Sequence, residues 1–262
     1  MSRFAAALLA AAFAASPALA QSPFDGTWKT DVSTIKVSPK PDVFSVRNGV
    51  YTCESCVPRV EVIADKADHA VTGHPYYDQV AVAVVDDRTI RVARRHKGKL
   101  MFVGESKVSP DGKLLSFAFK DTSGANGQIV TGRGSQHRVG PVPAGAHAVS
   151  GSWVTDKLEG ISDAGVTLTL KTSGDTLHAV AGTGETYDAH FGGPAVPVSG
   201  DPGHTMAAVK RLSPTAFQET DMRDGKVVGV MTLSVDPGGK TASLKWEDRV
   251  HGTTETSKMK KQ

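Results

Sequence analysis

The sequence lacks most of the patterns that mark an enzyme or a nucleic-acid-binding protein. It has no Gly-x-Ser-x-Gly motif, no Gly-x-x-x-x-Gly-Lys-Ser/Thr phosphate loop and no dinucleotide fingerprint. Its nine histidines show no metal-binding spacing such as His-Glu-x-x-His. No basic run is interleaved with aromatic residues, so nucleic acid is not predicted as a partner. We therefore predict no cofactor and no metal ion, and an enzyme is not the favoured interpretation.

Long hydrophobic runs are absent after residue 20, and the one before it is short. Residues 1–20 resemble a secretory signal peptide: Arg3 gives a positive start, an apolar run follows from Phe4 to Ala15, and the segment ends in small residues. A membrane-spanning helix needs roughly 20 apolar residues, so no membrane span is predicted. Gln21 stands where a lipoprotein would need cysteine. We expect a soluble protein that is periplasmic or secreted.

Cysteine is scarce, and both copies lie in the segment Cys53-Glu54-Ser55-Cys56. In an oxidising compartment such a pair is expected to form a disulfide bond. Redox or thiol chemistry would favour a helix that begins at the second cysteine, but Val57-Pro58 predicts a turn. A zinc site would need two more nearby ligands. The structural disulfide is the favoured interpretation, with thiol chemistry and a metal site as alternatives.

A long internal repeat is the most informative feature that is present. Gly98-Lys99 recurs as Gly225-Lys226 and Gly73-x-Pro75 recurs as Gly200-x-Pro202, and both offsets are 127 residues (225−98 and 200−73). The opening Gly-x-Trp segments at Gly26 and Gly151 are offset by 125 residues (151−26). A duplicated unit of roughly 120 residues has the usual size of a domain. The chain is thus predicted to contain two similar domains.

Alternating apolar residues predict strands throughout both copies. Leu115, Phe117 and Phe119 share one face of a strand over 114–120, and the equivalent positions of the second copy are also apolar. Turn dipeptides such as Asp-Gly and Gly-Gly separate these segments, and no amphipathic helix is predicted after residue 20. In the second copy the strands are predicted near 151–157, 165–172, 175–181, 186–191, 204–211, 215–223, 226–235, 240–248 and 252–260.

The predicted fold class is all-β, with two duplicated antiparallel meander β-barrels after the signal peptide. A long meander exposes two edges, and closure into a barrel removes them. The predicted domains are 21–139 and 150–262, joined by a Pro/Gly linker over 140–149; one joint sheet is the alternative to two separate barrels. Because aromatic residues make up only 6% of the chain, mainly aliphatic interiors are expected. The residues predicted to face inward are Phe44, Val46, Ile90, Val92, Phe117, Leu168, Leu170 and Trp246.

The Gly-x-Trp openings at Gly26/Trp28 and Gly151/Trp153, each followed by a meander, resemble the lipocalin-like (calycin) group of barrels. The resemblance covers nearly the whole chain after residue 20. It implies that each tryptophan closes one end of a barrel that holds a ligand.

The same resemblance implies that a basic residue of a last strand packs across each tryptophan. Arg138 matches this role in the first unit and Lys260 in the second. A further segment is similar to small exported bacterial proteins of unknown function, and its matching residues are Tyr187, Ala189, Phe191, Gly193, Pro197, Val198, Gly200 and Pro202.

The sequence thus favours an exported protein that holds a small apolar or amphipathic ligand in a β-barrel. His74, Tyr76 and Tyr77 crowd one turn and are candidates for the rim of a ligand pocket, together with Trp28 and Trp153. One alternative is a structural or protein-interaction module of the cell envelope with solid barrels. The other is a thiol-based enzyme that uses the two cysteines.

Overall fold

The computed structural model describes residues 22–262, so the predicted signal peptide lies outside the described residues. The described chain forms twenty β-strands and one 3-10 turn, η1 (Asp163–Gly165), with no α-helix. These strands build two antiparallel sheets of ten strands each, and each sheet curls into a nearly closed barrel. The predicted all-β fold with two meander barrels is confirmed. Residues 22–262 contain no helix that is long and apolar enough to span a membrane.

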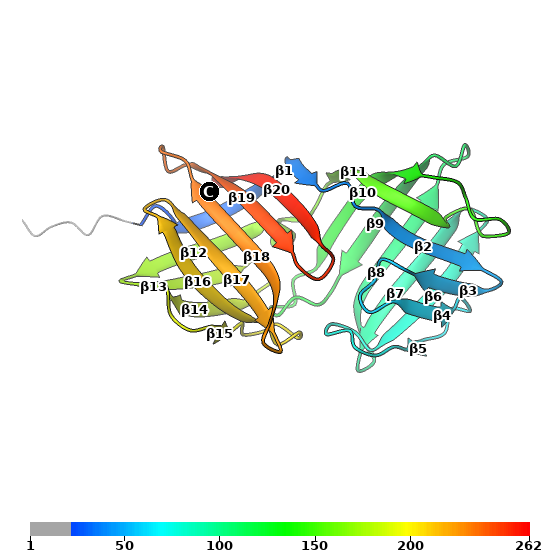
Figure 1. The fold of residues 1–262 in the computed structure, drawn as a ribbon, viewed down its shortest axis with the longest axis horizontal. Helices are drawn as coiled ribbons and strands as arrows, with labels where there is room; N and C mark the ends of the chain where they lie inside the picture. The colour runs from blue at the N-terminus through cyan, green and yellow to red at the C-terminus, as the bar shows by residue number, and fades with distance from the viewer. Residues whose placement is uncertain (1–21) are drawn as a thin grey trace, which may run out of the picture.

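The first barrel has the strand order β4-β3-β2-β11-β10-β9-β8-β7-β6-β5 (Figure 1). Its strands are β2 (Asp42–Arg47), β3 (Val50–Cys53), β4 (Val60–Ile63), β5 (His69–Ala70), β6 (Gln79–Asp86), β7 (Thr89–His96), β8 (Lys99–Val108), β9 (Leu114–Asp121), β10 (Val130–Val139) and β11 (Gly151–Glu159).

The second barrel has the strand order β14-β13-β12-β1-β20-β19-β18-β17-β16-β15. Its strands are β1 (Gly26–Val37), β12 (Thr167–Ser173), β13 (Thr176–Ala181), β14 (Thr186–His190), β15 (Val196–Pro197), β16 (Met206–Ser213), β17 (Ala216–Arg223), β18 (Lys226–Val235), β19 (Thr241–Asp248) and β20 (Thr253–Lys261).

The two repeats exchange their first strands. Strand β1, which opens the chain, lies in the second barrel between β12 and β20, whereas β11 lies in the first barrel between β2 and β10. Figure 1 shows β1 in blue beside the red β20, while β2 continues in the other barrel. The sequence division into 21–139 and 150–262 therefore marks the repeats but does not separate the barrels.

The connections explain the exchange. Only residues 38–41 join β1 to β2, and both Pro39 and Pro41 lie in this segment. Proline fixes its own φ and keeps the preceding residue extended, so this connection is too stiff for a tight hairpin between β1 and β2. The predicted linker 140–149 joins β10 to β11, which are neighbours in the first barrel. The chain crosses between barrels at 38–41 and 160–166 instead.

Each barrel is filled at one end by a core around a tryptophan. Trp28 is fully buried in the second barrel, and Trp153 is fully buried in the first. Their indole Nε1 atoms donate hydrogen bonds to the carbonyl oxygens of Phe24 and Val149, at 2.7 and 2.8 Å. The two cores are therefore built alike, as expected for a duplication, but each takes its tryptophan from the other repeat.

Candidate functional site

A cavity of about 410 Å³ lies in the first barrel, beyond the core around Trp153. Its apolar wall is formed mostly by inward-facing residues of neighbouring strands: Phe44, Tyr51, Ile90, Val92, Phe102, Phe117 and Phe119. Four of the residues predicted to face inward line this cavity, namely Phe44, Ile90, Val92 and Phe117. The first barrel is thus packed at one end and hollow at the other.

Strand β7 shows how the sequence produces a barrel that is packed at one end and hollow at the other. Its alternate residues Ile90, Val92 and Arg94 all line the cavity, and Ile90 is also buried in the core with 2% exposure. Val92 and Arg94 are half-buried, and Arg94 also lines the space between the barrels. Alternate residues of a strand face the same side. The inward side of β7 therefore changes from apolar Ile90 and Val92 near the core to basic Arg94 where the cavity adjoins the space between the barrels.

Glycines on β10 let two phenylalanine rings lie flat against the wall. A Cβ on Gly132 would come within 2.6 Å of the Phe119 ring, and one on Gly134 within 2.5 Å of the Phe117 ring. Such contacts exclude any side chain larger than hydrogen at these two positions. The rings therefore cover bare backbone, as aromatic residues do over strand glycines, and the cavity gains an aromatic surface.

One wall of the cavity is polar. Asp42 accepts a hydrogen bond of 2.7 Å from the side-chain amide of Gln136, which also lies 3.4 Å from the Thr155 hydroxyl. Burial raises the pKa of Asp42, and the hydrogen bond from Gln136 partly opposes this effect. Burial also raises the pKa of Tyr51 to about 12, so this phenol stays protonated. The cavity therefore offers hydrogen-bonding groups beside its aromatic surface.

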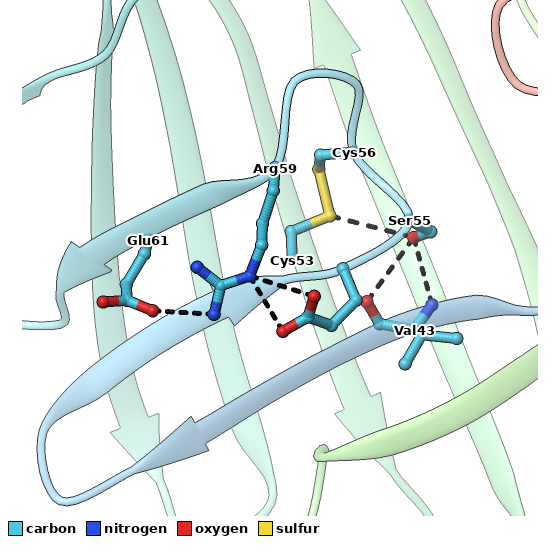
Figure 2. A network of polar contacts seen from close by, with 7 residues as sticks. Val43, Cys53, Ser55, Cys56, Arg59 and Glu61 are labelled. Carbon is cyan, nitrogen blue, oxygen red and sulfur yellow. Dashed lines mark hydrogen bonds and ion pairs between the residues drawn. A yellow bond between two sulfur atoms is a disulfide. The ribbon is translucent and has the colours of Figure 1, made fainter.

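The disulfide bond joins Cys53 and Cys56, whose Cα atoms are 5.4 Å apart, as favoured from the sequence. Both cysteines line the cavity. Figure 2 shows the loop that they close, in which Ser55 binds the backbone of Val43 on β2, with Val43 N donating to the Ser55 hydroxyl at 3.0 Å. The loop is thereby tied to the neighbouring strand and forms a fixed part of the cavity wall.

The side chain that follows this loop is held by two acids. Arg59 Nε lies 2.9 Å from both carboxylate oxygens of Glu54, and Arg59 Nη2 donates to Glu61 at 2.7 Å (Figure 2). All three side chains are about half exposed, so we assign them to the outer surface of the loop rather than to the cavity.

The second barrel has a smaller, partly open pocket of about 250 Å³ that is lined by two acids. Glu219 and Asp221 are alternate residues of β17, and the Tyr187 hydroxyl donates a hydrogen bond of 2.6 Å to Glu219. Burial, together with the nearby Asp221 carboxyl group, raises the pKa of Glu219 to about 8, and burial raises that of Asp221 to about 6. Leu168, predicted to face inward, also lines this cavity.

A cleft of about 300 Å³ lies between the barrels, and the turn with His74, Tyr76 and Tyr77 forms part of it. His74 stacks on Tyr77 with ring centroids 4.4 Å apart. Tyr76 reaches across to the second barrel, where its hydroxyl accepts a hydrogen bond of 2.6 Å from Arg223. The three residues singled out from the sequence thus line one cleft, which Trp246 and several groups that the sequence did not suggest also line.

Trp28 and Trp153 are the two candidates that the structure does not bring to this site. Both are fully buried in the cores, and neither lines the three cavities described above. The Arg138 guanidinium lies 4.0 Å from the centre of the Trp153 ring, and the Lys261 amine lies 4.8 Å from that of Trp28.

A basic residue does cover each tryptophan, but both assignments need correction. Arg138 covers the tryptophan of the second repeat, because β11 lies beside β10. Lys261, and not Lys260, covers Trp28, because alternate residues of a strand face opposite sides. Lys260 forms an ion pair with Asp31 at 3.0 Å.

Among residues 22–262 no group of three or more His, Cys, Asp or Glu side chains is arranged to hold a metal ion. No protein-family model matches the chain, and a search of curated proteins gives no match. The function must therefore be inferred from the geometry of the cavities.

Asp42, Gln136, Glu219 and Asp221 were not predicted as site residues from the sequence. Their common property is a polar side chain at an inward position of an otherwise apolar alternation. That pattern was visible in β17, where Phe217, Glu219 and Asp221 alternate, and it identifies groups that face a cavity instead of a packed core.

Proposed function

We propose that this protein is an exported binding protein that holds a small amphipathic molecule in the first barrel. The observation that carries the proposal is the cavity of about 410 Å³, with an aromatic surface on one side and Asp42, Gln136 and Thr155 on another. Small-molecule sites typically measure roughly 300–1,000 Å³ and combine apolar walls with a few polar groups. In a solid interaction module we would expect side chains to fill this space.

The cavity is also built to stay open. The glycines of β10 keep side chains out of it, and the disulfide loop supports its wall. Voids larger than a water molecule are few in protein interiors because they forfeit packing contacts. A space that is kept open in this way and lined by aromatic rings and buried polar groups is therefore best explained by an occupant.

The neutral fluorescent probe N-phenylnaphthylamine tests this proposal on the mature protein. We expect saturable binding with a rise in fluorescence, and Val92→Phe should weaken it at least tenfold because the added ring fills the cavity. Arg91→Phe is the matched control, since Arg91 precedes Val92 on β7 and its side chain is 56% exposed. Equal affinities for the wild type and Val92→Phe would place the probe elsewhere and refute the proposal.

A further inference from the structure

The three cavities are neighbours that share walls. The first-barrel cavity and the cleft share Cys56, Arg94 and His251, so the cavity adjoins the cleft at this point. Tyr76, Thr205 and Asp221 are common to the cleft and the second-barrel cavity. A molecule in the first barrel can therefore extend toward the cleft past Arg94.

Arg94 differs from its strand neighbours in having no acidic partner. Arg91 binds Glu105 at 2.8 Å and Arg95 binds Asp68 at 3.0 Å, whereas no ion pair within residues 22–262 includes Arg94. Its side chain is half-buried at the junction of two cavities. A charge that is partly removed from water is often paired, and this guanidinium has no anionic partner within residues 22–262.

The contacts of Arg94 leave its donors available. Its guanidinium carbon lies 5.0 Å from the centre of the Tyr77 ring and 5.1 Å from that of Phe102. A cation–π contact takes up no N–H donor, and no hydrogen bond within residues 22–262 involves the Arg94 guanidinium. Two aromatic contacts therefore fix the group without consuming the donors that bind a carboxylate or phosphate.

The cleft beside Arg94 is lined by charges of both signs. Burial lowers the pKa of His74, and the charge of Arg94 lowers it further. The second barrel contributes Arg223, which lines the same cleft and donates to Tyr76 and to the carbonyl of Gly203. Arg94 and Arg223 thus contribute one cation from each barrel to the cleft, which Asp221 and Asp248 also line.

The two repeats have diverged at this position. Asp221 is the counterpart of Arg94 and Glu219 is the counterpart of Val92, at the offset of 127 residues (221−94 and 219−92). An anion is therefore favoured in the first barrel and disfavoured in the second. The repeats are not equivalent ligand sites.

We propose that the ligand is an anionic amphiphile whose carboxylate or phosphate group binds Arg94 at the junction with the cleft. Its apolar body occupies the first-barrel cavity, so the inference rests on the proposed function and specifies the ligand class. The cleft then serves as the entrance to the site.

Two probes with the same ring skeleton separate this inference from the proposed function. N-phenylnaphthylamine is neutral, and anilinonaphthalene sulfonate adds one anionic group. We expect the wild type to prefer the sulfonate, and Arg94→Gln to weaken sulfonate binding roughly 10- to 100-fold while the neutral probe keeps its affinity. Arg91→Gln removes the same charge from the outer face and should change neither affinity.

The results distinguish the two failures. Neutral binding without any preference for the sulfonate would overturn the role of Arg94 and leave the proposed function intact. Binding of neither probe would overturn both. Equal losses of both probes in Arg94→Gln would show that Arg94 only supports the wall.

A second set of ligands needs no variant and guards against misfolding of Arg94→Gln. Decanoate, decyl phosphate and decanol are compared as competitors of bound N-phenylnaphthylamine on the wild type. Stronger competition by either anion than by decanol supports the inference, and the better anion identifies the head group. Equal competition by all three would contradict it. Arg94→Lys keeps the charge but loses the planar fork and should bind decanoate with intermediate affinity.

Discussion

Replacing either core tryptophan should loosen the barrel in which it lies and not the repeat that encodes it. Trp28 belongs to the first repeat but is fully buried in the core of the second barrel, beside Phe24 and Leu170. Trp153 belongs to the second repeat and is fully buried in the first barrel. The strand exchange therefore predicts crossed effects for Trp28→Ala and Trp153→Ala.

The expected magnitude is large compared with the stability of a domain. A Trp→Ala change in a core costs about 3–5 kcal/mol, which includes the cavity that it leaves. The free energy of unfolding of a domain is only about 5–15 kcal/mol. Since each 1.4 kcal/mol is a factor of ten, amide exchange through unfolding of the affected barrel should accelerate roughly 100- to 4,000-fold.

Hydrogen exchange followed by mass spectrometry measures this effect separately in each barrel. Peptides from 206–235 report on β16–β18 of the second barrel, and peptides from 79–121 report on β6–β9 of the first. Trp28→Ala should accelerate exchange mainly over 206–235, and Trp153→Ala mainly over 79–121. The reverse pattern would refute the exchange of strands.

A designed cross-link gives an independent control. The hydroxyl oxygens of Thr27 on β1 and Thr169 on β12 lie 3.0 Å apart across the strand pair. The double variant Thr27→Cys/Thr169→Cys should form a second disulfide within a monomer, visible as a further loss of about two daltons. A cross-link found only in covalent dimers would place β1 in another molecule.

Three further predictions concern a titrating group, a bond and two glycines. Burial raises the Glu219 pKa above its ordinary value of 4.5 to about 8, so the stability of the second barrel should fall as pH rises between these values; Glu219→Gln should remove most of this dependence in thermal unfolding. Serine in place of both cysteines should cost about 2 kcal/mol in urea unfolding, because the loop is short. Gly151→Ala should destabilise more than Gly26→Ala. A Cβ at Gly151 would lie 2.5 Å from the fixed guanidinium of Arg138, whereas at Gly26 it meets the flexible chain of Lys261 at 3.2 Å.

Local patterns were enough to predict most strands. The ranges 226–235 and 240–248 correspond to β18 (Lys226–Val235) and β19 (Thr241–Asp248), and the other strands predicted in the second repeat agree within a few residues. Alternation fixes which side chains face inward, and turn residues fix where each strand ends. Alternation and turn residues are both local patterns that extend over only a few residues, so a single sequence is enough to detect them.

The exchange of β1 and β11 could not be predicted because it is a choice between two equivalent partners. Both strands open with Gly-x-Trp and bury their tryptophans in cores of the same design. Either strand would satisfy either barrel, so the short connection through Pro39 and Pro41 decides between them. The two prolines are present in the sequence. Their effect on the position of β1 can be recognised only when both barrels are built, because only then can the two possible positions of this strand be compared.

The asymmetry of the cleft follows from the same duplication. Tyr76 and Gly203 are counterparts at the offset of 127 residues (203−76), and they meet across the cleft. A Cβ on Gly203 would lie 2.7 Å from the Tyr76 ring, so the tyrosine of one repeat fits only because the other repeat has glycine at that position. Arg223 then bonds both the Tyr76 hydroxyl and the Gly203 carbonyl oxygen. Since the crossings at 38–41 and 160–166 hold the barrels together, the two copies could specialise at this contact. The first barrel has the aromatic-lined cavity, whereas at its approach the second repeat contributes Asp221 to the cleft and Arg223, which binds Tyr76 of the first repeat.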